Sequence, residues 1–302
     1  MGKITVIGSL NMDIIVSVDR MPQKGETIHG NKVQYLPGGK GANQAVAVRR
    51  LGGDVQLFGK IGKDPFGDEI CESLSQQGLP TETIFPMETA TGIANITLLP
   101  DDNSIVVIPG ANQNWDPENI AGLSEAIGTA DVLMMQLEIP VAAVHQALKL
   151  AKQQGVQTIL NPAPAKQLPV EMLRLADFIT PNQTELETLT GRRITTDEEL
   201  ETMIQKWEAD FGGRLIVTQG NRGAAYMEKG NLKVIPAPQI DHIRDTTGAG
   251  DCFNGALAYG IAEGWELSCS ISFAVAAASL SVAKFGAQAG MPSFQDVLEW
   301  WG

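Results

Sequence analysis

Short runs of apolar residues alternate with amphipathic stretches along most of the chain. From about residue 116 the alternation is regular, and strands are expected at 131–137, 156–160, 177–180 and 214–218. Helices are expected around them, where apolar residues recur with a helical period: 116–128, 140–154, 168–174, 183–190 and 197–211. Repeated strand–helix units predict a mostly parallel sheet with helices on both faces.

The two ends of the chain extend this pattern. Near the N-terminus we expect a buried strand at 3–9, a helix that stops at Gly52, a strand at 55–61 and a helix at 65–77. Near the C-terminus we expect helices at 250–263 and 267–283, a loop at 284–290 and a last helix. The sequence therefore predicts an α/β core that uses both ends of the chain.

Two segments break the alternation. Residues 13–36 contain Pro22 and Gly25 and favour strands and loops, whereas the β-rich stretches 91–99 and 104–108 flank a turn and predict a hairpin. We predict that the two segments pair as a small β-sheet lid that excludes water from a site. The predicted core comprises 1–12, 37–90 and 110–302, and the predicted discontinuous lid comprises 13–36 and 91–109.

Composition limits the possible partners. The formal net charge of -13 argues against general binding to nucleic acid or to anionic membranes, because both need a basic surface. No apolar run approaches the length of a membrane span, and because the first residues already favour a strand we expect no signal peptide. Cys71, Cys252 and Cys269 are odd in number and lack CxxC spacing, which predicts a reducing, cytoplasmic location.

The strongest chemical signal is the stretch Asp245-Thr246-Thr247-Gly248-Ala249-Gly250-Asp251, directly before a helical pattern. Small residues let the backbone approach an oxyanion, and the N-terminus of a helix offers free N–H groups and a partial positive charge. Asp251 beside such an anion hole suits the transfer of a phosphoryl group to a hydroxyl. The alternative is a glycine-rich turn in which the aspartate only caps the helix.

Polar residues follow the ends of several predicted strands. They are Asn11, Asp13, Glu138, Asn161, Asn182 and Thr218. Each could be structural when taken alone, but together they fall on the edge where open α/β sheets bind ligands. Gly38 to Ala45 adds a glycine pair before a helix, although Gly41 after Lys40 excludes a Walker A loop.

These segments resemble known motifs. Gly38-Gly39-Lys40-Gly41-Ala42-Asn43-Gln44-Ala45 and residues 245–251 resemble the two signatures of the ribokinase (phosphofructokinase-B-type) family of sugar kinases. Asn11-x-Asp13, Asn182-x-x-Glu185 and Thr218-x-Gly220-x-x-Gly223 resemble further family motifs, in the right order. The resemblance implies a ribokinase-like three-layer sandwich and a carbohydrate kinase that phosphorylates D-ribose at the 5-hydroxyl, using ATP and Mg²⁺ or another divalent cation.

The resemblance also implies residue roles. Asp251 would be the general base, and Gly248, Ala249 and Gly250 would form the anion hole. The sugar would contact Asn11, Asp13, Gly39, Lys40, Gly41, Ala42, Asn43, Glu138 and Asp251. ATP would contact Asn182, Thr218, Gln219, Gly220, Asn221, Arg222, Gly223, Gly250 and Val275.

Metal sites are implied in the same way. Glu185 would hold Mg²⁺ through water, and a K⁺ site would use Asp245, Thr247, Ser281, Lys284, Gly286 and Gly290. Two positions depart from the family pattern, since Gly290 stands where a serine is common and Val275 where a histidine is common. The first departure removes a side-chain oxygen from the cation site.

Other functions stay open at this point. A kinase for deoxyribose, a nucleoside or another small sugar shares these motifs, and a non-catalytic sugar- or nucleotide-binding protein could use the same fold. A dinucleotide-dependent oxidoreductase is disfavoured because no GxGxxG follows the first strand. An exposed edge of the lid favours a homodimer through the lid sheet.

Overall fold

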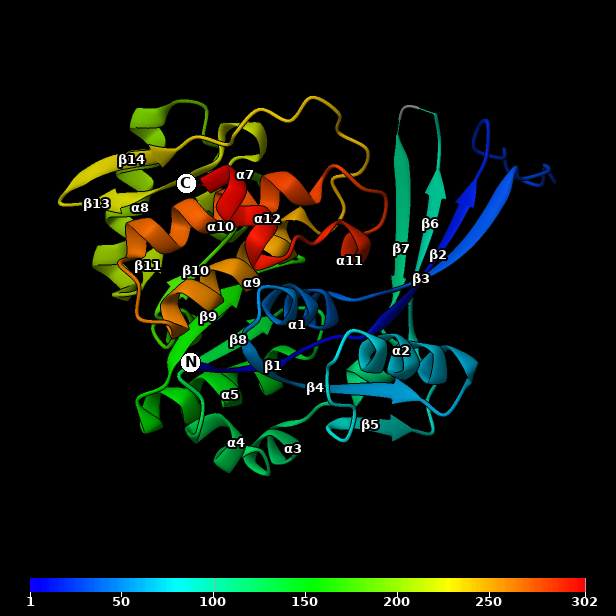
Figure 1. The fold of residues 1–302 in the computed structure, drawn as a ribbon, viewed down its shortest axis with the longest axis horizontal. Helices are drawn as coiled ribbons and strands as arrows, with labels where there is room; N and C mark the ends of the chain where they lie inside the picture. Colours follow the sequence, from blue (N-terminus) through cyan, green and yellow to red (C-terminus); the bar gives the residue numbers. More distant parts are fainter. Residues whose placement is uncertain (101, 302) are drawn as a thin grey trace.

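The structure is a computed structural model that describes residues 1–100 and 102–301. Its central sheet has the strand order β11-β10-β9-β8-β1-β4-β5, and all its pairs are parallel (Figure 1). The strands are β1 (Lys3–Ile7), β4 (Asp54–Gly62), β5 (Ile84–Met87), β8 (Val132–Gln136), β9 (Gln157–Asn161), β10 (Phe178–Ile179) and β11 (Arg214–Leu215).

Helices cover both faces of this sheet. Alternate side chains of a strand point to opposite faces, so Val6 and Met134 join one apolar core while Ile7 and Met135 join the other. The first core is closed by α1 (Lys40–Arg50), α2 (Pro65–Gln76), α9 (Ala249–Ala262), α10 (Leu267–Ser281) and α12 (Phe294–Trp301). The second is closed by α3 (Pro117–Ala121), α4 (Ser124–Gly128), α5 (Val141–Gln154), α6 (Val170–Leu173), α7 (Gln183–Thr190) and α8 (Asp197–Phe211).

A four-stranded sheet, which we call the lid sheet, stands beside this core on the right of Figure 1. Its strands are β2 (Asn11–Ser17), β3 (Lys32–Gly38), β6 (Gly92–Leu98) and β7 (Asn103–Ile108), in the order β3-β2-β6-β7. The central pair β2–β6 is parallel and the outer pairs are antiparallel. The two segments that break the strand–helix alternation therefore pair with each other, and β7 is an edge strand.

The predicted fold class is confirmed, with differences in detail. The helix expected at 116–128 is two short helices, α3 and α4, separated at Gly122 and Leu123. The strand expected at 214–218 is divided at Ile216 into β11 and β12 (Val217–Thr218). The N–H of Thr218 still donates to the carbonyl oxygen of Pro181 at 3.0 Å, beyond the end of β10, and β12 also pairs with β13 (Ala224–Glu228), which in turn pairs with β14 (Asn231–Ile235).

Several elements were not foreseen from the sequence, β5 and α11 among them. The edge strand β5 contains Pro86, which is tolerated because a proline on an edge removes no donor that the sheet needs. A short helix, α11 (Ala287–Gly290), occupies part of the expected loop at 284–290. None of the described helices has the length and apolarity needed to cross a membrane.

Candidate active site

The carboxylate of Asp251 lies in the first turn of α9 and is almost completely buried, with an exposed fraction of 6%. Asn43 donates its Nδ2–H to Oδ2 at 2.9 Å, and Gln44 donates its Nε2–H to Oδ1 at 3.1 Å. Burial, with a smaller effect of Glu138, raises the pKa of Asp251, and nearby Lys40 and these two amides offset only part of this upward shift. The carboxylate is therefore held in one orientation by donors that favour its anion.

The start of α9 has the form of an anion hole. Gly248 caps the helix with φ 80°, and Ala249 and Gly250 begin it. A Cβ at Gly248 would lie 2.7 Å from the Cβ of Ala287, whereas a Cβ at Gly250 would meet nothing within 4 Å. The helix is thus packed tightly on the side of α11 and open at Gly250, where a phosphoryl group can approach the free N–H groups.

Lys40 starts α1 opposite this helix. Burial lowers the pKa of Lys40, but surrounding carboxylates raise it by more, and the net shift is upward; they belong to Asp251, Glu138, Glu185 and Asp13. The ammonium group consequently stays charged at neutral pH and offsets part of the negative charge of the site.

Glu138 follows β8 and closes the N-terminus of α1, which has no side-chain cap of its own. Its Oε2 accepts hydrogen bonds from Ser9 Oγ at 2.6 Å and from the backbone N–H of Lys40 at 3.1 Å. A Cβ at Gly41 would lie 2.6 Å from the backbone of Gly8, so this glycine is required for α1 to approach the end of β1. The glycine-rich segment thereby brings Lys40 to the carboxyl edge of the sheet.

Asp13 faces the same cleft from the lid sheet. Its pKa is raised to about 7 by burial first and then by Glu138, Asp251 and Asp245, with Lys40 opposing. Asn11 is held by Asn112, whose Nδ2 donates to Asn11 Oδ1 at 2.8 Å. Asn112 also accepts the backbone N–H of Leu10 at 3.0 Å. Sequence reasoning missed Asn112 because it belongs to no motif and meets Asn11 only through the fold.

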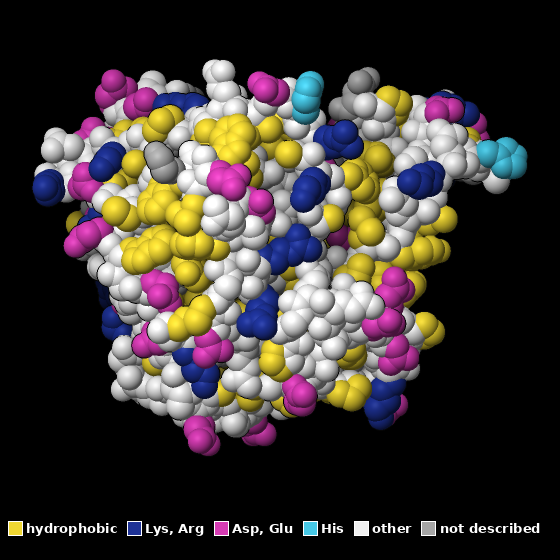
Figure 2. All heavy atoms as spheres, in the orientation of Figure 1, with side chains coloured by type: hydrophobic (Ala, Val, Ile, Leu, Met, Phe, Trp, Pro, Cys, Tyr) yellow, Lys and Arg dark blue, Asp and Glu magenta, His cyan; other side chains and the backbone are white. Residues whose placement is uncertain are grey.

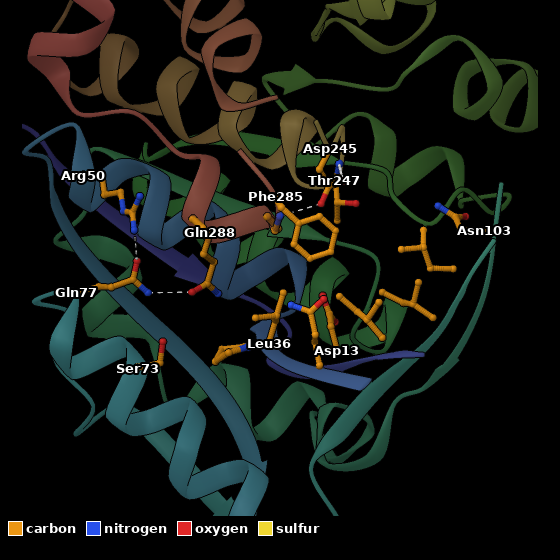
Figure 3. Close-up of a pocket in the computed structure, with 18 residues that line it drawn as sticks. Asp13, Leu36, Arg50, Ser73, Gln77, Asn103, Asp245, Thr247, Phe285 and Gln288 are labelled. Carbon is orange, nitrogen blue, oxygen red and sulfur yellow. Dashed lines mark hydrogen bonds between the residues drawn. The ribbon is translucent and has the colours of Figure 1, made fainter. Parts of the chain in front are cut away.

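A cavity of about 430 Å³ opens between the lid sheet and the core (Figure 3). Asp13, Leu36 and Asn103 line it from the lid sheet, and Thr247, Phe285 and Gln288 from the core. Figure 3 shows Asp13 and Leu36 pointing toward Thr247 and Phe285 across the gap. The cavity is large enough for a small ligand and bounded by both predicted domains.

A second cavity, of about 640 Å³, lies on the other side of the α9 N-terminus. Of the residues expected at ATP, its lining includes Asn182, Thr218, Gly220, Asn221, Gly223, Gly250 and Val275. Gln219 and Arg222 are outside the lining, and the guanidinium of Arg222 pairs with Asp197 of α8 at 2.6 Å. Apolar residues complete the walls and suit a flat purine ring: Ala237, Ile243, Phe253, Ala278 and Val282.

The residues expected to bind a monovalent cation lie in the segment around Thr247 and in the segment 281–290. Asp245 connects these two segments through hydrogen bonds. Its Oδ1 accepts the N–H of Thr247 at 2.9 Å, and its Oδ2 accepts the N–H of Gly286 at 2.8 Å. A Cβ at Gly290 would lie only 2.2 Å from the carbonyl oxygen of Ser281, so this backbone has no room for a serine side chain. The described residues contain no cluster of three or more His, Cys, Asp or Glu side chains that could hold a metal ion.

Comparison with known proteins agrees with this geometry. The profile of the pfkB family carbohydrate kinases matches residues 1–293. This chain belongs to that family. It is 41% identical to a ribokinase of Lactococcus lactis over 98% of this chain and 96% of that protein, and 41% identical to a ribokinase of Bacillus subtilis over 99% of both.

A solved structure in the family has the same fold. The ribokinase of Arabidopsis thaliana, complexed with ribose and ATP, superposes with a TM-score of 0.91 at 33% identity, covering 99% of this chain and 98% of that chain. The family membership predicted from the two signatures is therefore confirmed across almost the whole chain.

Proposed function

We propose that this protein transfers the γ-phosphoryl group of ATP to the 5-hydroxyl of D-ribose, giving D-ribose 5-phosphate and ADP. The observation that carries the proposal is the buried Asp251 carboxylate, fixed by two amides at the N-terminus of α9. Ribose as the acceptor is supported by relatives that are ribokinases and by a similar structure complexed with ribose and ATP.

In this proposal Asp251 removes the proton of the 5-hydroxyl while the new O–P bond forms and the bond from the γ-phosphorus to the bridging oxygen breaks. The N–H groups of Gly248, Ala249 and Gly250 stabilise the transferring group, together with the partial positive charge of the helix, although that of Ala249 also donates to the carbonyl oxygen of Thr246 at 3.2 Å. The charged Lys40 adds to this stabilisation. Positioning and charge neutralisation of this kind are the main demands of phosphoryl transfer.

Asp13 lines the cavity beneath the lid sheet, whereas Glu138, Asn11 and Asn43 are outside its lining. Polar groups of these kinds suit sugar hydroxyls. We propose that the carboxylates of Asp13 and Glu138 and the amides of Asn11 and Asn43 bind them, while Gly39, Gly41 and Ala42 permit close approach of the backbone. Asp13 is then an acceptor whose burial cost is offset by sugar O–H donors. ATP occupies the second cavity, with its phosphates directed to the open end of α9 at Gly250.

A divalent cation fits this donor set. Mg²⁺ is commonly bound through one or two carboxylates, several waters and the phosphates of the substrate, and it neutralises charge on those phosphates. Glu185 supplies such a carboxylate, because its Oε2 accepts the backbone N–H of Asn182 at 2.8 Å and is thereby fixed at the start of α7. We propose that Glu185 binds Mg²⁺ through water.

A monovalent cation is proposed at the loops that Asp245 joins. K⁺ would be held there by the carboxylate and by backbone carbonyl groups of the segments around Thr247 and from Ser281 to Gly290. Gly290 contributes no side chain, so such a site would rest on backbone oxygens and Asp245. Turnover measured with K⁺ and with Na⁺ tests this assignment.

We also propose a homodimer and a cytoplasmic location. The edge strand β7 exposes Ile105, Val106, Val107 and Ile108, and Figure 2 shows apolar side chains on this side of the molecule. An exposed apolar edge is commonly protected by pairing with a second copy. The cytoplasmic location is supported by the three cysteines, which are all free thiols.

Asp251→Asn tests the proposed reaction. We expect kcat for ribose to fall by about 10²–10⁴-fold, the range that general-base assistance supplies, while ribose still binds in calorimetry. Asp210→Asn, at an exposed position of α8, is the matched control and should behave as wild type. Near-normal turnover by Asp251→Asn would exclude the base role, and faster turnover of deoxyribose or a nucleoside by the wild type would exclude ribose as the preferred acceptor.

A further inference from the structure

An unbroken line of side-chain hydrogen bonds connects Arg50 with Asp251. Arg50 donates to Gln77 Oε1 at 3.2 Å, and Gln77 Nε2 donates to Gln288 Oε1 at 2.9 Å. Gln288 Nε2 donates to Asn43 Oδ1 at 3.1 Å, and Asn43 Nδ2 donates to Asp251 at 2.9 Å. Figure 3 shows the first part of this line, where Arg50, Gln77 and Gln288 meet at the side of the lid cavity.

The chemistry of the two ends fixes the direction of every bond between them. A guanidinium can only donate, and an ionised carboxylate can only accept. Gln77, Gln288 and Asn43 lie between these ends, so each must present its oxygen toward Arg50 and its NH₂ toward Asp251. Reversing any one amide would bring two oxygens or two NH₂ groups together.

The line joins three elements that are distant in sequence. Arg50 ends α1, Gln77 caps the C-terminus of α2, and Gln288 lies in α11. Arg50 also donates to the backbone carbonyl of Met291 at 2.8 Å, directly after α11. Gln288 is buried and Gln77 is half-buried, so solvent does not freely replace the bonds that hold Asn43 in place.

Besides Asn43, the charge of Asp251 is stabilised by the amide of Gln44, by the first turn of α9 and by one cation. Lys40 is the cation that faces it, whereas Glu138, Asp13 and Glu185 are acidic groups facing the same site. The thiol of Cys252 is adjacent and buried, and its pKa is raised to about 12, so it stays neutral. Among these acidic groups, fixing the NH₂ of Asn43 toward Asp251 matters, because a hydrogen bond to the carboxylate favours its ionised form.

We propose that Gln77 and Gln288 are positioning residues for phosphoryl transfer, which hold the NH₂ of Asn43 toward Asp251 through a one-way line of hydrogen bonds from Arg50. This inference rests on the proposed role of Asp251 as the base. Neither glutamine touches the reacting atoms; each acts through Asn43.

Gln77→Glu tests the direction of the line. A carboxylate at 77 still accepts from Arg50 but cannot donate to Gln288, so Gln288 and then Asn43 must turn, and Asn43 presents its oxygen to Asp251. Gln77→Met breaks the line without reversing it. Gln76→Glu is the matched control, because it adds the same charge at the exposed neighbouring position on α2.

Two readouts separate this inference from the proposed function. The first is the pH dependence of kcat/KM for ribose at saturating ATP, where the acidic limb reports ionisation of the free enzyme. The second is a ¹³C NMR titration of aspartate carboxyl groups, with Asp251→Asn identifying the signal, which needs no turnover. Thermal unfolding checks that each variant is folded.

We expect the pKa of Asp251 to rise in Gln77→Glu by about one unit, and kcat/KM below that pKa to fall about tenfold. Gln77→Met should show a smaller rise, and Gln76→Glu none. Equal titration curves for Gln77→Glu and Gln76→Glu would overturn the inference, even if the enzyme is active. A wild type that phosphorylates no sugar would instead overturn the proposed function, and the NMR titration would still decide the role of the line.

Discussion

The two walls of the cleft are built in different ways. On the core wall, both oxygens of Asp251 accept hydrogen bonds from buried amides, and Gln44 is itself fixed by Gln136 and Asn161. On the lid wall, the cavity is lined mainly by apolar side chains from the lid sheet, and every residue of β7 is exposed. The comparison indicates that the side chains of the core wall, which take part in phosphoryl transfer, are held in place without ligands. The lid sheet, by contrast, mainly covers the site and excludes water.

After Asp251→Asn, the largest effect is expected from disturbing the core wall at Gly248. Gly248→Ala places a Cβ 2.7 Å from that of Ala287 at a residue with φ 80°, so α11 and the start of α9 must move apart. Because loss of one anion-hole donor costs on the order of 10²-fold in rate, we expect kcat to fall by up to that amount. Steady-state kinetics with ribose and ATP measure the change.

Gly264→Ala is the control for Gly248→Ala, because it introduces a side chain at positive φ without a clash against another residue. Gly264 has φ 73°, but a Cβ there meets nothing within 4 Å. Both variants should lose about 1–2 kcal/mol of unfolding free energy, since a side chain is strained at positive φ. Equal kcat values for the two variants would show that the packing of α11 on Gly248 does not matter for transfer.

The second effect lies at Asn112, where the two walls meet. Asn112→Ala leaves the buried N–H of Leu10 without its acceptor, at a cost of about 1–3 kcal/mol in stability, and frees Asn11. We expect the KM for ribose to rise about tenfold, equivalent to about 1.4 kcal/mol, with a smaller change in kcat. Asn114→Ala, which removes only a contact with Thr89, is the control and should leave KM unchanged.

A third effect concerns the charge of Asp13. Its pKa of about 7 in the fold exceeds the ordinary value of 3.8, so the folded protein binds more protons than the unfolded chain between these values. Its contribution to stability is therefore present at acidic pH and is lost as the pH rises through about 7. Asp13→Asn should raise the midpoint of thermal unfolding at pH 8 by roughly 2–4 °C for each kcal/mol relieved.

The pH dependence distinguishes this cause from a general packing effect. The stabilisation by Asp13→Asn should be much smaller at pH 5 than at pH 8, measured by differential scanning calorimetry without ligands. An equal shift at both pH values would contradict the linkage to ionisation of Asp13.

The smallest effect on catalysis is expected at the outer face of the lid sheet. Val106 is 59% exposed and lies on the face opposite Asn103, which lines the cavity. Val106→Lys should convert the proposed dimer to monomers in sedimentation velocity, because a lysine blocks association of an edge strand. Ser104→Lys, nearer the tip on the same face, should weaken association less. A dimer that persists in Val106→Lys would place the contact elsewhere.

Much of the fold can be predicted from the sequence, because the periodicity of apolar residues and the residues that begin or end a helix are local signals. α7 and α8 have the predicted bounds, and each begins with a capping box, in which Asn182 or Thr196 bonds Glu three residues later. β5 was missed because a strand of four residues that includes a proline shows too little alternation of apolar and polar residues. The division of 214–218 at Ile216 is signalled by no local pattern of residues.

Site residues could be predicted where they belong to a sequence motif. They could not be predicted where only the tertiary structure brings them together. Lys40, Asn43 and Asp251 stand in glycine-rich signatures, and the fold brings them together. Asn112, Gln77 and Gln288 carry no such signal, because their roles arise only when distant helices meet. Arg222 lies outside the lining of the second cavity and pairs with Asp197 of α8, so its expected contact with ATP stays a prediction.

The most direct test of the central claim identifies the product. Wild type and Asp251→Asn are incubated with D-ribose, ATP and Mg²⁺, and the reaction is followed by ³¹P NMR, with ¹³C-labelled ribose to locate the ester. The account predicts that the wild type forms ribose 5-phosphate and that Asp251→Asn forms almost none, although it still binds ribose. A phosphate on another hydroxyl, or equal product from the two proteins, would contradict it.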